Sequence, residues 1–165
     1  MGFMLALVVE SALAAEDFSK KPQTMPMCDV VKSLIAEHKN GFESLRGGLL
    51  MKKEFTIWQA RYHVVGNGCE IWESDREDTF YVCTRSAPTE DIAKEYYNTS
   101  RERFRACLGK EWTEAEVPRQ SGGKKTTFSN KDSKAAFEIH EVKIDGIRGD
   151  QWTIYYLAGG APKSL

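Results

Sequence analysis

The stretch that decides the fold is residues 69–84, CEIWESDREDTFYVCT, in which two strand-like arms flank an acidic turn. The arms predict an antiparallel hairpin centred on Arg76. Its register has three facing pairs: Cys69 with Cys83, Ile71 with Tyr81 and Trp72 with Phe80. A shift of one residue would break all three pairs, so the register is well specified. We therefore expect a disulfide between Cys69 and Cys83.

The other two of the four cysteines, Cys28 and Cys107, lie on either side of this hairpin. An even number of cysteines in an exported chain predicts two disulfides. Cys28 opens a predicted helix and Cys107 lies near the end of another, so antiparallel neighbouring helices would join them. Free thiols in a cytosolic protein are the alternative. The cysteine spacing contains no C-x-x-C pair, and we expect no metal site.

The N-terminal residues 1–15 are typical of a signal peptide, followed by a polar linker over 16–24. The apolar stretch GFMLALVVESALAA ends in small residues that suit cleavage after Ala14 or Ala15. It is too short to span a membrane, so we expect no stable span after cleavage. No basic residue precedes it and Glu10 interrupts it, which leaves an N-terminal helix packed on the domain as the alternative.

Apolar periodicity predicts two amphipathic helices, at about residues 27–45 and 88–112. Predicted strands cover 54–64 and the two hairpin arms in the first half, and 126–129, 135–144 and 151–157 in the second. Residues 117–125 are expected to form a loop, because they are rich in proline, serine and glycine.

These elements predict an α+β fold, with the two helices packed on an antiparallel sheet in the order αβββ-αβββ. A similar pattern ends both helices, Phe42-x-x-Leu45-x-Gly47 and Phe104-x-x-Cys107-x-Gly109. The two halves are therefore either a duplicated unit or unrelated segments whose helices end with similar residues. Residues 25–160 are expected to form a single disulfide-bonded domain.

Composition limits the kinds of partner. The 165 residues carry a formal net charge of −1, which does not suit a nucleic-acid binder. No cofactor motif is present: Ser121 to Thr126 resembles a phosphate loop, but Pro118 stands where that motif needs glycine.

The sequence offers few catalytic candidates. Of its three histidines, His38 falls on the apolar face of the first helix and is expected in the core. His63 and His140 could meet across neighbouring strands and recruit Glu138, which leaves an unrecognised hydrolase as one hypothesis. No established catalytic motif occurs, and whether the protein is an enzyme stays open, with the balance against it.

The function we expect is that of an exported, periplasmic or secreted, non-enzymatic protein-binding module, such as an inhibitor, an immunity-type protein or an accessory protein. Its partner would be another protein, bound by the polar strand face of Gln59, Arg61 and His63. The alternative is a carrier of a small apolar ligand in a helix–sheet cavity. That cavity would be lined by six aromatic residues: Trp58, Tyr62, Trp72, Tyr96, Tyr97 and Phe104.

Overall fold

The computed structural model describes residues 25–66, 68–74, 78–144 and 151–160. The predicted signal peptide 1–15 and linker 16–24 lie outside these residues, as does Arg76 at the centre of the hairpin turn. No helix in the described ranges has the length and apolar character needed to cross a bilayer.

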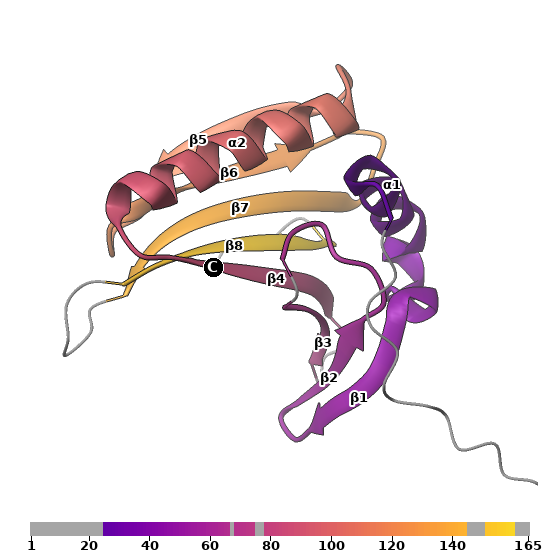
Figure 1. The fold of residues 1–165 in the computed structure, drawn as a ribbon. Helices are drawn as coiled ribbons and strands as arrows, with labels where there is room; N and C mark the ends of the chain where they lie inside the picture. The colour runs from indigo at the N-terminus through magenta and orange to yellow at the C-terminus, as the bar shows by residue number, and fades with distance from the viewer. Residues whose placement is uncertain (1–24, 67, 75–77, 145–150, 161–165) are drawn as a thin grey trace, which may run out of the picture.

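Eight described strands form one antiparallel sheet in the order β1-β2-β3-β4-β8-β7-β6-β5. Their bounds are Arg46–Lys52 (β1), Phe55–Ala60 (β2), Cys69–Ser74 (β3), Thr79–Ala87 (β4), Thr113–Pro118 (β5), Gly123–Ser129 (β6), Ala135–Ile144 (β7) and Gln151–Gly160 (β8). The sheet bends strongly, so that β1 to β3 stand at an angle to the strands beyond β4 (Figure 1).

Within the described residues, each half consists of one α-helix followed by four strands, with two 3-10 turns after the first helix. The first half begins with α1 (Met27–Glu37) and the second with α2 (Glu90–Leu108), and pairing of β4 with β8 joins the halves. The predicted fold, two helices packed on an antiparallel sheet in the order αβββ-αβββ, is therefore wrong. The fold is mostly sheet: α2 lies along β4, β7 and β8, whereas α1 packs mainly against α2 and the 3-10 turns that follow α1.

The first missed strand, β1, follows a helix that ends earlier than predicted. Gly41 and Phe42 adopt left-handed backbone conformations, with φ of 59° and 58°. Only 3-10 turns, His38–Asn40 and Glu43–Leu45, flank this break. The apolar spacing continues through both turns as far as Leu45, which is why periodicity alone predicts a single long helix.

The second missed strand, β5, carries acidic residues on its helix-facing side. Glu114 and Glu116 make ion pairs with Arg101 of α2, so this edge strand lacks the apolar face that identifies a strand in sequence. The predicted loop 117–125 is instead the end of β5 and the start of β6, joined by a tight turn over residues 119–122. Within it the Arg119 amide donates to the Gly123 carbonyl at 3.1 Å.

The hairpin register is confirmed, since Cys69 pairs with Cys83, Ile71 with Tyr81 and Trp72 with Phe80. Both expected disulfides are present. Cys69–Cys83 crosses β3 and β4, and Cys28–Cys107 joins the start of α1 to the end of α2. Two intramolecular disulfides fit an oxidising, extracytoplasmic compartment.

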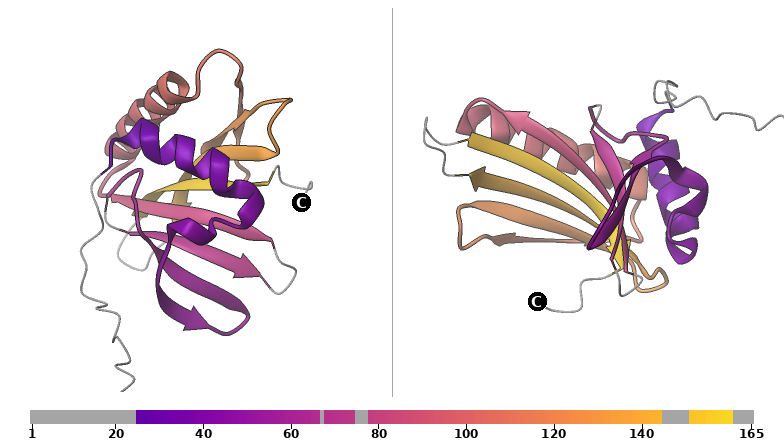
Figure 2. Two further views of the ribbon diagram at one scale, coloured as in Figure 1. Left: turned by 90° about the vertical axis from the view of Figure 1, so that its right-hand side faces the viewer. Right: turned by 90° about the horizontal axis from the view of Figure 1, so that it is seen from below.

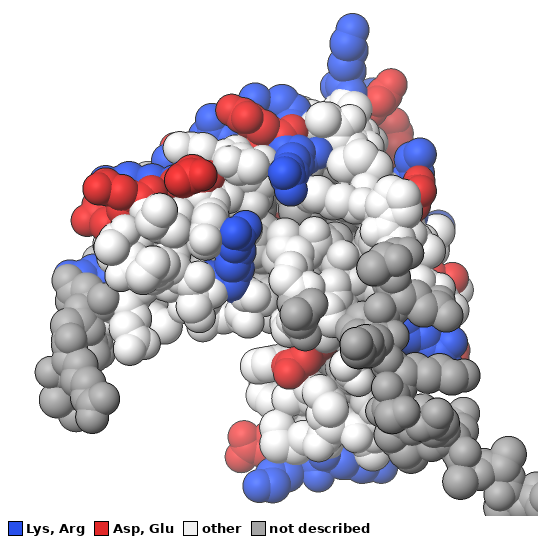
Figure 3. All heavy atoms as spheres, in the orientation of Figure 1, with Lys and Arg blue, Asp and Glu red and all other residues white. Residues whose placement is uncertain are grey.

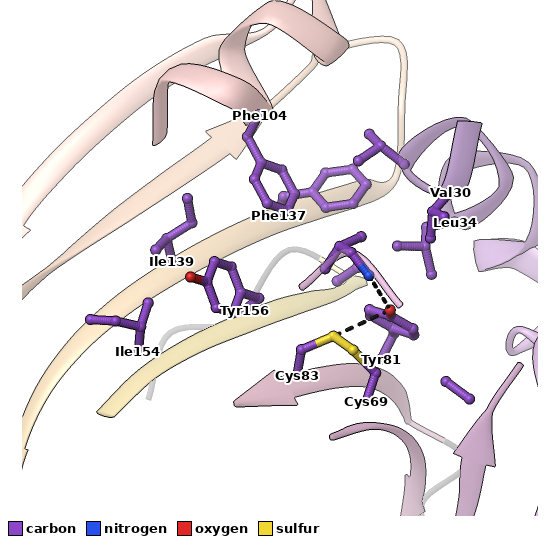
Figure 4. Packing of buried hydrophobic residues seen from close by; sticks show 14 of the residues in the cluster. Val30, Leu34, Cys69, Tyr81, Cys83, Phe104, Phe137, Ile139, Ile154 and Tyr156 are labelled. Carbon is purple, nitrogen blue, oxygen red and sulfur yellow. Dashed lines mark hydrogen bonds between the residues drawn. A yellow bond between two sulfur atoms is a disulfide. The ribbon is translucent and has the colours of Figure 1, made fainter. Parts of the chain in front are cut away.

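The core lies between the helices and one face of the sheet (Figure 4). Phe104 of α2 stacks on Phe128 and Tyr156, and α1 contributes Val30 and Leu34. Both helices lie on this one side (Figure 2), so no described helix covers the opposite face, which we call the open face. The Cys69–Cys83 bond lies on the core side, directly behind the open face.

Candidate functional site: the open face of the sheet

The register of the sheet shows which side chains share the open face. They form rows that run across neighbouring strands. One row contains Met51, Ile57, Trp72 and Phe80. The next contains Gln59, Glu70, Val82, Leu157, Glu138 and Thr127, and a third contains Thr84, Tyr155, His140 and Lys125. The face is thus apolar on β2, β3, β4 and part of β8, and polar on β6 and β7.

We call the apolar part the apolar patch, which consists of Phe55, Ile57, Trp72, Phe80, Val82 and Leu157. Phe55 and Phe80 are 39% and 37% exposed, which is high for large apolar side chains. The outline of the molecule is hollowed on this side, below β4 and β8 and beside β1 to β3 (Figure 3). Exposed aromatic groups in a concave surface are typical of binding sites.

The aromatic rings of the patch are held in place by local contacts. The Trp72 indole nitrogen donates a hydrogen bond of 2.6 Å to Glu70 Oε2. Its ring centroid lies 6.0 Å from that of Phe55. The Phe80 ring lies against the backbone of Gly159, where a Cβ atom would come within 2.7 Å of Phe80 Cδ1. The patch is therefore a preorganised surface.

Beside the patch lies a polar group that we call the His140 cluster: Arg119, Lys125, Thr127, Glu138 and His140. Glu138 accepts hydrogen bonds from three of the others. The distances are 2.7 Å from His140 Nε2, 3.1 Å from Lys125 Nζ and 3.2 Å from Thr127 Oγ1. The side chains of Glu138 and His140 are only 13% and 17% exposed, because the members of the cluster cover one another.

The contact with Arg119 defines the protonation of His140. Arg119 Nη1 lies 3.0 Å from His140 Nδ1. A guanidinium can only donate, so Nδ1 must accept and the ring proton resides on Nε2, which donates to Glu138. Both ring nitrogens are engaged, which leaves the imidazole no free position for general base catalysis.

Glu138 is ionised over most of the pH range. Burial alone would raise the pKa of its carboxyl, but hydrogen bonds from His140 and Lys125, together with the positive charges that these two groups can carry, outweigh burial and hold the pKa at about 2. Because this folded pKa lies below the unfolded value of about 4.3, Glu138 stabilises the fold above about pH 4.5. That stabilisation is lost as the pH falls towards 2.

Replacing Glu138 by glutamine is therefore expected to lower the free energy of unfolding at pH 7 by about 1–2 kcal/mol, after allowance for solvent screening. The difference between wild type and variant should shrink steadily between pH 4.5 and about 2. Urea unfolding at a series of pH values measures both quantities.

Glu141, on the same strand but on the helix side, is the matched control. It is 3% exposed, and burial raises the pKa of its carboxyl. Its charged form is thus disfavoured in the fold, so Glu141→Gln should not lower stability at pH 7. A loss from Glu141→Gln as large as that from Glu138→Gln would contradict this account.

A second polar group lies on the covered face, between α2 and the outer strands. Tyr97 shares hydrogen bonds with Thr126 and Glu116, and Arg101 pairs with Glu116 at 2.7 Å. Burial raises the pKa of the Tyr97 hydroxyl. These contacts attach α2 to β5 and β6. Because they lie beneath the helix, we interpret them as structural.

The structure does not place Gln59, Arg61 and His63 on one strand face. β2 ends at Ala60, so only Gln59 lies in the strand. Arg61 Nε donates to the Arg46 carbonyl at 2.6 Å, and the His63 ring contacts the backbone carbonyls of Ala60 and Gly66. The predicted strand extension to residue 64 is wrong, and as a binding site this trio stays a prediction.

The proposed meeting of His63 with His140 does not occur. His63 follows β2, and His140 lies on β7. Three strands, β3, β4 and β8, lie between β2 and β7 in the sheet. Neighbouring strands are about 4.8 Å apart, so these histidines are well beyond contact. No group of three or more His, Cys, Asp or Glu side chains suited to a metal ion occurs in the described ranges.

The six aromatic residues of the predicted carrier cavity do not line a common space. Tyr97 and Phe104 are packed in the core, whereas Trp72 lies on the open face. A surface pocket of about 520 Å³ lies elsewhere, at the end of α2. Its lining residues are Arg105, Ala106, Gly109, Lys110, Trp112, Glu114 and Phe128.

Comparisons of the chain with protein-family models, with curated proteins and with solved structures find no match.

Two signals in the sequence pointed to the open face. The hairpin register places Trp72 opposite Phe80, and the alternation of residues 137–142 places Glu138 and His140 on one side of a strand. Arg119 and Lys125 give no such signal, because the segment that contains them has the composition of a loop.

Proposed function

We propose that the protein is an exported, periplasmic or secreted, binding module that holds another protein against the apolar patch of its open face. An inhibitor, an immunity-type protein or an accessory protein would work in this way. The observation that carries the proposal is the exposure of Phe55 and Phe80, beside the half-buried Trp72, on a surface that no described helix covers.

The position of the Cys69–Cys83 bond supports this proposal. Trp72 and Phe80 face each other on the same hairpin that this bond crosses, and the bond lies on the opposite side of the sheet. Aromatic groups on a rigid scaffold lose little conformational freedom on binding, which favours affinity. Tryptophan, tyrosine and arginine are also the residues most often found as binding hot spots.

The His140 cluster argues against a hydrolase. Its imidazole is fully engaged, and Thr127, the hydroxyl residue of the cluster, donates to Glu138 rather than to the ring. A nucleophile and its base need a direct hydrogen bond, and none is found within this cluster.

The Trp72→Ala variant is expected to reduce partner binding by about 30-fold or more, as loss of a central aromatic hot spot of about 2 kcal/mol implies. The measurement is quantitative mass spectrometry of proteins crosslinked to the immobilised protein, in cell-envelope extract and in culture medium. The partner recovered with wild type is then expressed and its affinity measured directly.

The matched control is the double variant Arg61→Ala/His63→Ala, which changes the two predicted site residues that lie outside β2 and leaves the patch intact. It should bind the partner as wild type does. Retained binding by Trp72→Ala together with loss in the double variant would move the site to residues 61–63 and refute the open-face proposal. Unfolding curves of both variants exclude a folding defect as the cause.

A further inference from the structure

The His140 cluster borders the apolar patch on the open face. Leu157 of the patch pairs with Val82 on one side and with Glu138 of the cluster on the other. Arg119, from the turn between β5 and β6, reaches across β6 to His140 on β7. A change in the position of Arg119 therefore changes the surface next to the patch.

Arg119 is held there by a contact that depends on one proton. His140 Nδ1 accepts from the guanidinium at 3.0 Å and can do so only without a proton of its own. Protonation of Nδ1 would leave two donors and two positive charges facing each other. Arg119 Nε is buried and has no hydrogen-bond partner among the described residues, so in this part of the chain the contact with His140 is the hydrogen bond that holds the guanidinium.

We propose that Arg119 and His140 form a proton-controlled latch on the open face. With a neutral imidazole, Arg119 lies over β6 and β7; with a protonated imidazole, Arg119 is released from the sheet. The consequence for partner binding rests on the proposed function, because the released guanidinium would alter the charge beside the apolar patch. The latch itself does not depend on a partner.

Groups from each neighbouring element act on His140. Glu138, which lies on the same strand as His140, favours the protonated ring, whereas the positive charges of Arg119 and Lys125 disfavour it. Tyr155 of β8 and Thr127 of β6 are uncharged. Glu138 receives its hydrogen bond from Nε2 in both states of the ring. The change on protonation is therefore confined to Nδ1 and to Arg119.

The test is a pH titration of the isolated protein between about pH 8 and 5, the range in which histidine side chains change charge. NMR follows the His140 ring protons and the Arg119 Nε–H group. In wild type both signals should change with the same midpoint. In Arg119→Ala the His140 midpoint should rise by about 0.5 pH unit or more, because a like charge and a bond to the neutral ring are both removed.

The ring of His63 is the internal control, since it contacts only backbone carbonyls in the described residues and its midpoint should not move. In His140→Gln, which stays neutral, the Arg119 signal should no longer depend on pH. The latch is overturned if the His140 midpoint is unchanged in Arg119→Ala, or if the Arg119 signal of wild type does not change as His140 titrates. Since no partner is present, either result leaves the proposed function untouched.

Discussion

Removal of the Cys28–Cys107 bond by the double substitution Cys28→Ala/Cys107→Ala is expected to lower the free energy of unfolding by about 4 kcal/mol. The two cysteines are 79 residues apart, and the chain-entropy model gives about 4.5 kcal/mol for a loop of this length. A single domain has only about 5–15 kcal/mol in total, so this loss should be visible as a large fall in the denaturation midpoint.

The same variant should lower the local stability of α1 more than that of the rest of the molecule. α1 has 11 residues, a length that is marginal for an isolated helix, and its main packing partner is α2. Without the bond, the amide protons of α1 should exchange faster than those of β7 and β8. Hydrogen exchange by NMR or mass spectrometry measures this difference.

The control is Cys69→Ala/Cys83→Ala, which removes a bond inside the sheet and should leave the relative protection of α1 unchanged. A stability loss below about 1 kcal/mol in the Cys28–Cys107 variant, with α1 still fully protected, would show that helix packing alone holds α1 in place.

Local patterns predicted the parts of the fold that depend on neighbouring residues. The hairpin register could be read because pairs on both faces agreed, and β7 could be read because Phe137 and Ile139 alternate with polar residues. The two disulfides followed from the positions of the cysteines on these elements. In each case the information lies within one or two adjacent segments.

The parts that were missed depend on contacts between distant segments. β5 is stabilised as a strand by ion pairs from Glu114 and Glu116 to Arg101, which lies on the preceding helix. The end of α1 depends on the left-handed conformation of Phe42, which is rare for residues other than glycine. Neither feature has a periodic signal in the sequence.

The open face could be predicted only in part for a related reason. The sequence pattern favours a polar strand face at Gln59, Arg61 and His63 and places Trp72 in a cavity. The strand order of the sheet puts β4 next to β8 and so brings the apolar hairpin beside the polar strands β7 and β6. The sequence order of the strands does not contain this information.

Gly123 is expected to be the position in the β5–β6 turn least tolerant of substitution. Its φ is +79°, and a Cβ atom there would lie 2.0 Å from the carbonyl oxygen of Glu141. That oxygen belongs to the backbone of β7, which cannot move without separating β6 from β7. Gly123→Ala should therefore lower the free energy of unfolding by about 4 kcal/mol or more. Losses of this size arise when a substitution forces a steric clash with groups that cannot move.

Its neighbour Gly122 is the matched control. Its φ is +88°, but a Cβ atom there would meet only the Lys143 side chain, at 3.5 Å. Gly122→Ala should thus cost only the backbone strain of about 1–2 kcal/mol. Urea unfolding of the two variants isolates the contact with Glu141, since both positions carry the same kind of backbone strain.

The two variants also report on the open face. Arg119 and the turn that carries it are fixed by the Arg119–Gly123 hydrogen bond, so separation of β6 from β7 at Gly123 should also displace Arg119 from His140. Equal stability losses in the two variants would show that β6 and β7 can separate locally at little cost. In that case the turn would be too mobile to hold Arg119 over the sheet, and the latch would lose its structural basis.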